Sequence, residues 1–163
     1  MELRTLSKEH IPALTRLMEQ GDPYVRVRGE SDYWLYSELF ADTCPIMIED
    51  GQVIGAVLAF HSQVNSSETY IQDVMVHPDH RRKGIASKLI TVLSERAREA
   101  GRTLIYLTSE PDNTAAHETW MRLGFQNRPG TRKDGAVEVI ENFKGVGKDR
   151  AVYDLALSPR AAS

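Results

Sequence analysis

The chain has 163 residues, about the size of one ordinary domain, of which 41% are hydrophobic and 26% are charged. Its net charge of -3 excludes a generally basic nucleic-acid-binding protein, so any basic patch must be local. The one cysteine, Cys44, excludes an internal disulfide framework and favours a reducing cytoplasm. No apolar run reaches the roughly 18 residues that span a bilayer, and the N-terminus lacks the order of a signal peptide. We therefore predict one cytoplasmic domain over residues 1–163 that binds neither membrane nor nucleic acid.

The N-terminal part of the chain predicts a short strand and two helices. Residues 2–7 alternate as a strand, and Ser7 can cap a helix that runs to about Gln20. A Gly-Asp-Pro sequence breaks that helix. A second helix is predicted over residues 30–42. Its apolar residues are Trp34, Leu35 and Leu39.

A hairpin and a further strand are predicted next. Asp50 and Gly51 separate two apolar runs, which is typical of a tight β-turn. The second run, residues 53–60, is apolar on both faces and therefore predicts a central strand. Residues 69–78 predict another strand, which ends at its proline. Cys44, at the edge of the first apolar run, is predicted to be a small buried residue and not a nucleophile.

The second half of the chain alternates between helices and strands. Residues 84–101 carry apolar side chains at helical spacing and form the clearest helix, which a glycine ends. A strand over residues 102–109 and a short helix over residues 113–124 follow. The chain closes with two strands joined by a glycine-rich turn, over residues 136–143 and 149–158. This order predicts an α/β (α+β) domain with a mixed, mostly antiparallel sheet that contains one right-handed βαβ unit.

A basic turn separates the strand that ends at Pro78 from the helix that begins at Gly84. The first turn of a helix has N–H groups without partners, and the helix dipole adds positive charge, so an anion such as phosphate fits there. Gly84 lets the backbone approach a ligand because it has no Cβ, and Ala86 is nearly as small. Mobile positive charge surrounds the same point. It comes from Arg81, Arg82, Lys83 and Lys88.

Other phosphate and metal motifs do not match. A Walker A loop ends in Gly-Lys-Ser/Thr, whereas the stretch Gly145–Asp149 places an aspartate where the Mg²⁺-binding hydroxyl belongs. A Rossmann G-x-G-x-x-G fingerprint is missing as well. His77 and His80 form an H-x-x-H pair, but no further ligand stands at zinc-binding spacing. We therefore predict a solvated turn there and no metal.

Two motifs carry a resemblance to a known family. The basic turn fits the pattern Q/R-x-x-G-x-G/A through Arg81, Gly84 and Ala86, and the block from Asn113 to Phe125 fits N-x-x-A-x-x-x-Y-x-x-x-G-F except at its tyrosine. With these motifs the sequence resembles the GNAT superfamily of N-acetyltransferases, and order and spacing agree over about residues 46–125. The resemblance implies a central sheet of about six to seven strands flanked by about four helices.

The resemblance also implies a site for acetyl-CoA as the cosubstrate. In the family, the pantetheine arm bonds the strand before the basic turn like an extra strand, a role that falls here on Val74, Met75 and Val76. Asn113 would contact the CoA arm near the following helix. The pyrophosphate would meet the turn and the helix start. These residues are Arg81, Arg82, Lys83, Gly84, Ile85 and Ala86.

The implied chemistry is direct attack of a neutral amine on the thioester carbonyl. The backbone N–H of Val76 or Met75 would stabilise the oxyanion. Asp73 could take the amine proton, hold the substrate ammonium, or serve as a structural carboxylate that caps a turn. It alternates with Ile71 and Met75, which would place it on a buried face.

Trp120 stands where many relatives have the tyrosine that gives a proton to the departing thiolate. Because an indole N–H is a very weak acid, Trp120 is predicted to pack against the CoA arm or in the core. Tyr106 and Tyr153 are the candidate substitutes, and the thiolate can also leave unaided. His117 is predicted to be a surface residue.

The sequence thus predicts an acetyl-CoA-dependent N-acetyltransferase that acts on a small-molecule primary amine. Transfer to protein lysines or N-termini and a non-catalytic acyl-CoA-binding module are the alternatives, and a homodimer is possible. Acceptor specificity in the family comes from the first two helices and the last hairpin. Carboxylates and aromatic side chains there could hold a cation or form an ordinary amphipathic helix. They are Glu30, Asp32, Tyr33, Trp34, Tyr36 and Glu38.

Overall fold

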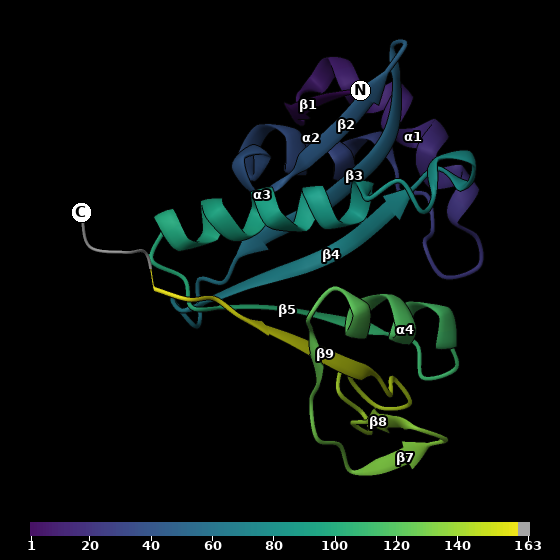
Figure 1. Cartoon of the computed structure of the whole chain (residues 1–163), viewed down its shortest axis with the longest axis vertical. Helices are drawn as coiled ribbons and strands as arrows, with labels where there is room; N and C mark the ends of the chain where they lie inside the picture. Colours follow the sequence, from purple (N-terminus) through teal and green to yellow (C-terminus); the bar gives the residue numbers. More distant parts are fainter. Residues whose placement is uncertain (160–163) are drawn as a thin grey trace.

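The computed structural model describes residues 1–159 as strands and helices arranged around one large sheet (Figure 1). The strands are β1 (Glu2–Thr5), β2 (Pro45–Glu49), β3 (Gln52–His61), β4 (Glu68–Val76), β5 (Leu104–Ser109), β6 (Gln126–Asn127), β7 (Arg132–Asp134), β8 (Val137–Val139) and β9 (Ala151–Ala156). The α-helices are α1 (Ile11–Met18), α2 (Glu30–Leu39), α3 (Ile85–Glu99) and α4 (Thr114–Arg122).

Seven strands form the central sheet in the order β1-β2-β3-β4-β5-β9-β6, and β7 pairs with β8 apart from it. Neighbours in the large sheet are antiparallel except β4 and β5, which are parallel and connected by α3. The mixed, mostly antiparallel α/β fold predicted from the sequence is therefore confirmed.

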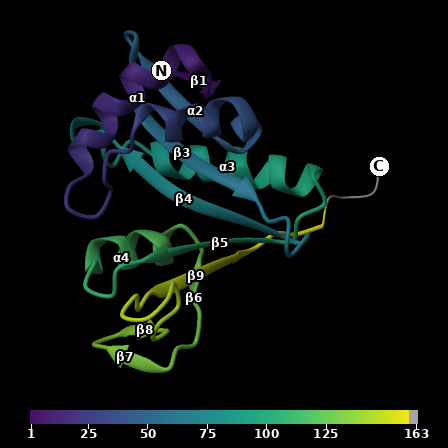
Figure 2. The ribbon, with the colours of Figure 1, turned by 180° about the vertical axis from the view of Figure 1, so that it is seen from behind.

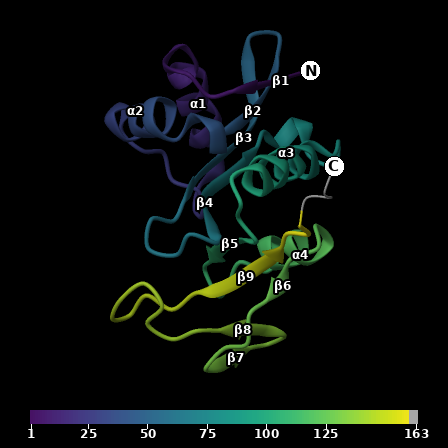
Figure 3. The ribbon, with the colours of Figure 1, turned by 90° about the vertical axis from the view of Figure 1, so that its left-hand side faces the viewer.

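Helices cover both faces of the sheet. Helices α3 and α4 lie on one face, and α1 and α2 lie on the other (Figures 2 and 3). Each face has its own apolar core, with Leu89 and Leu93 of α3 in one and Leu14 and Tyr33 in the other. Because both faces are covered, β3 is buried from residue 53 to residue 59 and contains only apolar residues and glycine there.

Several local predictions are confirmed. Asp50 and Gly51 have φ values of 49° and 75°, as a tight hairpin turn requires. Gly84 and Gly101 flank α3 with φ values of 75° and 78°. Cys44 is fully buried. Glycine is favoured at both ends of α3 because residues with a Cβ disfavour a positive φ.

The apolar residues of the second helix are not the residues that it buries. Trp34, Leu35 and Leu39 are 44%, 40% and 61% exposed, whereas Tyr33 and Tyr36 are buried. A tyrosine can be buried where its hydroxyl finds a partner, and the Tyr33 hydroxyl accepts a hydrogen bond from a backbone N–H of the α1–α2 connection. The binary pattern alone does not show that partner.

Of the two predicted closing strands, the one over residues 149–158 is confirmed as β9, whereas the one over residues 136–143 is wrong. The predicted strand 136–143 is reduced to β8, which pairs with β7 across Gly135 and not with β9. An isolated bridge pairs Ile140 with Arg150, the residue before β9. Beyond Ile140 the chain forms a loop whose polar groups bond one another, so no further ladder is made.

A bulge interrupts the alternation of side chains along β4. Leu58 of β3 pairs with Asp73, and the next residue of β3 pairs with Ile71, so Gln72 is the extra residue. As a result Ile71 lies in the core beneath α3, whereas Met75 lies in the core beneath α1 and α2. Asp73 shares the face of Met75. The predicted common face with Ile71 is therefore wrong.

Candidate functional site

The site lies where β4 and β5 separate. The two strands pair only as far as Ile71 and Leu107, while β4 continues along β3 to Val76. Figure 1 shows the two strands diverging beyond this point, with the start of α3 beside the end of β4. Within residues 1–159, one edge of β4 is therefore left without a neighbouring strand beyond Ile71.

The main chain of β4 presents alternate residues to this open edge. The N–H of His77 donates to the carbonyl of Ile54 on β3, at an N···O distance of 2.8 Å. Because backbone groups alternate in direction along a strand, Met75 also turns its N–H and C=O toward β3. Val74 and Val76 then turn theirs toward the opening. An extended ligand with amide groups could bond these two residues.

The opening is a cleft of about 430 Å³. Its walls are the α1–α2 connection, β4, the end of β5 with the start of α4, and the loop before β9. Four residues singled out from the sequence line it, namely Asp73, Val74, Asn113 and Trp120. The side-chain oxygen of Asn113 accepts a hydrogen bond from the backbone N–H of Ala116 at 3.1 Å and so caps α4. The NH₂ group of Asn113 can then face a ligand.

The start of α3 has open space around it. The first intrahelical hydrogen bond runs from the N–H of Lys88 to the carbonyl of Gly84 at 3.0 Å, so the preceding N–H groups have no helical partner. A Cβ on Gly84 would meet nothing within 4 Å. A Cβ on Gly55 of β3 would lie 2.5 Å from Cγ2 of Ile85, so this glycine lets the helix start lie close to the sheet. The exposed Arg81–Gly84 turn adds positive charge at the same place.

A splayed β4 edge beside such a helix start is the arrangement that the sequence motifs imply. The model of the acetyltransferase (GNAT) family matches residues 13–125. The chain belongs to this family. Among its relatives by sequence, the L-2,4-diaminobutyric acid acetyltransferase of Marinococcus halophilus is 31% identical over 93 residues, which are 56% of this chain and 53% of the relative. The chain thus spans about half the length of that relative.

Two further GNAT comparisons agree. The aminoalkylphosphonate N-acetyltransferase of Salmonella typhimurium is 26% identical over 110 residues, 61% of this chain and 71% of the relative. The structure of diaminobutyrate acetyltransferase from Paenibacillus lautus, in complex with L-2,4-diaminobutyric acid and coenzyme A, has a TM-score of 0.76 at 19% identity. That match covers 99% of this chain and 98% of the other. At this identity it shows a shared GNAT fold.

Asp73 of this GNAT chain forms an ion pair inside the cleft. Its side chain is 10% exposed, and Arg28 Nε donates to its Oδ2 at 2.9 Å. Arg28 belongs to the α1–α2 connection, and its own N–H donates to the Tyr33 hydroxyl at 2.9 Å. Burial lowers the pKa of Arg28, but the hydrogen bond and charge of Asp73 outweigh it, and the pKa is raised. Within residues 1–159 no side chain donates to Asp73 Oδ1, so this oxygen can accept from a substrate.

The two candidate acid tyrosines lie outside the lining of the cleft, as far as residues 1–159 show. The Tyr106 ring packs 5.0 Å from that of Tyr70, and burial followed by the charge of Glu68 raises its pKa. Tyr153 is 1% exposed, and burial raises its pKa to about 12. Its hydroxyl lies 2.6 Å from Nδ1 of His117, which is half-buried and not the surface residue expected.

Trp120 has a packing role on one side and lines the cleft on the other. It is 9% exposed, and its ring meets Phe125 edge-on with centroids 5.5 Å apart. Its indole N–H donates to the hydroxyl of Ser109 at 3.2 Å. Both predicted positions, in the core and facing the cleft, therefore apply to the same side chain.

Several residues of the cleft were missed by sequence reasoning. The carboxylates of α2, Glu30, Asp32 and Glu38, are exposed and do not line it. By contrast, five cationic side chains line the cleft, together with the two carboxylates of Asp73 and Glu110. The glycine-rich turn before β9 was the available signal, because it contains two lysines. The cationic residues are Arg26, Arg28, Lys144, Lys148 and Arg150.

The turn that contains His77 and His80 is solvated at Pro78 and Asp79, but its two histidines are half-buried. His80 Nε2 lies 2.8 Å from Oε2 of Glu49, and the side chain of His80 is 19% exposed. Over residues 1–159, no three His, Cys, Asp or Glu side chains are grouped so as to hold a metal ion. In the same part of the chain, no helix is both long and apolar enough for a membrane span.

Proposed function

We propose that this chain is an acetyl-CoA-dependent N-acetyltransferase that acts on a primary amine of a small molecule. The observation that carries the proposal is the unpaired edge of β4, next to an open and positively charged helix start, in a GNAT fold. Relatives named as acetyltransferases of diaminobutyric acid and aminoalkylphosphonates support this substrate class. A single domain over residues 1–163, a cytoplasmic location and a homodimer remain predictions.

The residues that fit coenzyme A lie on β4, α3 and α4. The main chains of Val74 and Val76 would bond the pantetheine arm, with Met75 holding this strand on β3. The NH₂ group of Asn113 would donate to the same arm. The pyrophosphate would lie on the N–H groups from Arg82 to Ala86, within the positive field of the basic turn.

When bound, acetyl-CoA supplies a thioester carbonyl; a C–N bond to the amine forms, the C–S bond breaks, and the amine loses a proton. Asp73 Oδ1 is proposed to accept a hydrogen bond from the amine and orient it. The N–H of Val74 or Val76 would donate to the carbonyl oxygen. Tyr106 and Tyr153 are not among the residues of 1–159 that line the cleft, although Tyr106 precedes Leu107 of the lining and Tyr153 pairs with it. Unaided departure of the thiolate is therefore the simpler proposal.

Thiol release from acetyl-CoA with a panel of small amines tests the proposal, with coenzyme A binding followed separately by calorimetry. We expect amine-dependent thiol release and a lower kcat/KM in Asp73→Asn. If coenzyme A binds but no amine releases thiol, the chain is a CoA-binding module. Release with peptides alone would favour the protein acetyltransferase alternative. Cys44 is buried, and burial raises its pKa to about 12, so it should add little background to a thiol assay.

A further inference from the structure

The charge of the cleft is opposite to that of the whole chain. The sequence has a net charge of -3, yet five cationic and two acidic side chains line the cleft. Both carboxylates already have arginine partners. Arg28 binds Asp73 at 2.9 Å, and Arg150 lies 3.5 Å from Glu110. Three cationic side chains of the lining are therefore in excess, namely Arg26, Lys144 and Lys148.

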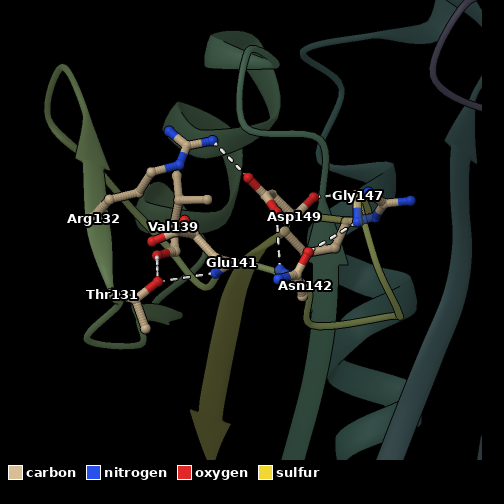
Figure 4. Close-up of polar contacts among 8 residues, drawn as sticks. Thr131, Arg132, Val139, Glu141, Asn142, Gly147 and Asp149 are labelled. Carbon is tan, nitrogen blue, oxygen red and sulfur yellow. Dashed lines mark hydrogen bonds and ion pairs between the residues drawn. The ribbon is translucent and has the colours of Figure 1, made fainter.

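The two lysines stand on a loop that its own hydrogen bonds hold in shape (Figure 4). Asp149 Oδ1 accepts the N–H of Asn142 at 2.8 Å, and Asn142 Oδ1 accepts the N–H of Gly147 at 2.8 Å. Arg132 donates to the other oxygen of Asp149 at 3.0 Å and ties the loop to β7. The loop is thus ordered before any ligand arrives, which lowers the entropic cost of binding through it.

Lys144 is further fixed against the sheet. Its Nζ donates to the hydroxyl of Tyr70 at 2.7 Å and lies 5.2 Å from the centre of that ring. Tyr70 is on β4 and shares a face with Asp73, because β4 carries one bulged residue between them. Figure 3 shows the loop before β9 on the same side of the sheet as α2, opposite α3 and α4.

Coenzyme A phosphates do not account for these lysines. The residues of the basic turn are not among those that line the cleft. Tyr70, which holds Lys144, lies six residues before Val76, or about 20 Å at about 3.3 Å per residue. The proposed pyrophosphate site lies beyond Val76. The excess positive charge therefore belongs to the acceptor side of the cleft.

We infer that the acceptor amine also carries an acid group, a carboxylate or a phosphonate, and that Lys144 and Lys148 bind it. This inference rests on the proposed N-acetyltransferase function and names its substrate class. Arg26, of the α1–α2 connection, adds positive charge to the same cleft. Asp73 then faces the amine end of the same molecule. The positive cleft has a second effect, because nearby cations disfavour an ammonium and so favour the neutral amine that attacks.

Matched acceptors test the inference with the full chain. β-Alanine, aminoethylphosphonate and β-alaninamide each present a primary amine on a two-carbon chain, and their other ends are a carboxylate, a phosphonate and an uncharged amide. We expect kcat/KM to be about tenfold or more higher for one of the acids than for the amide. Lys144→Met with Lys148→Met should remove about tenfold from the acid and leave the amide nearly unchanged. Lys133→Met, an exposed lysine of β7 outside the cleft lining, is the matched control.

Each outcome decides between the two proposals. Equal kcat/KM for acids and amide, or equal losses for both in the lysine variant, would overturn the acid-group inference and leave the transferase intact. A lower coenzyme A affinity in the lysine variant would overturn it too, since the lysines would then serve the cosubstrate. If no acceptor releases thiol, calorimetry on the CoA complex decides. Binding of the acid, lost in the lysine variant, would keep the anion site while refuting transfer, and equal or absent binding of acid and amide would refute the site.

Discussion

An aspartate at the start of α3 should repel coenzyme A without unfolding the protein. Gly84→Asp places a carboxylate in the open space beside the first helical N–H groups, where the built Cβ meets no atom within 4 Å. At about 5 Å from a phosphate charge and an effective dielectric constant of about 20, the repulsion is about 3 kcal/mol. That corresponds to a loss of about two orders of magnitude in affinity. Isothermal titration calorimetry with coenzyme A measures this loss directly.

The other end of the same helix supplies a matched control. Gly101 has φ of 78° and equally open surroundings, so Gly101→Asp carries the same backbone strain, about 1–2 kcal/mol for a residue with a Cβ. Fifteen helical residues at about 1.5 Å each place it about 22 Å away, beyond the screening length of about 8 Å at physiological salt. We expect lowered stability in both variants and lost binding only in Gly84→Asp. Normal coenzyme A affinity in Gly84→Asp, or an equal loss in both, would refute the reasoning.

Three further predictions concern the parts that support the cleft. Asp73→Asn should lower the free energy of unfolding by about 1–3 kcal/mol in urea titrations because Arg28 loses its charged partner, and Arg28→Met combined with it should cost less than the sum of the two single losses. A strictly additive result would show that the pair is not coupled. Gly55→Ala should lower the free energy of unfolding by about 1–3 kcal/mol, because the new Cβ would lie 2.5 Å from Cγ2 of Ile85 and must displace the start of α3. The same displacement should weaken coenzyme A binding. Unchanged binding would show that Gly55 does not support the coenzyme A site. The free energy of unfolding should stay constant below about pH 9 and fall as the pH rises toward about 12. Burial raises the pKa of three weakly acidic groups in the folded chain, so the unfolded chain loses these protons at a lower pH. The slope per group is at most about 1.4 kcal/mol per pH unit, and urea titrations at pH 8 and 11 that agree would contradict it. The three groups are Tyr36, Cys44 and Tyr153.

Several features of this protein follow from interactions between residues that are close together in the sequence. The positive φ of Gly84 and Gly101, the Asp50–Gly51 turn and the apolar run of β3 follow from backbone sterics and periodicity. The turn that we propose to bind phosphate could be singled out for the same reason, because a small residue at a helix start is a property of neighbouring residues in the chain. These features do not depend on distant partners.

Contacts between distant segments decided the rest. The bulge at Gln72 exists only in the pairing of β4 with β3, and it moved Asp73 to the face where Arg28 reaches it. The sequence pattern cannot reveal that the hydroxyl of Tyr33 has a backbone partner, so it does not show that α2 buries Tyr33 and leaves Trp34 exposed.

The cleft shows the same division most clearly. Its CoA side could be predicted because the strand and the basic turn are adjacent in sequence. Its acceptor side could not, because Lys144 reaches Tyr70 across 74 positions of the chain. The sequence by itself was enough to propose the cofactor half of the site. Only the tertiary structure brought together the positive charge of the proposed acceptor half, since electrostatic complementarity depends on distance in space and not along the chain.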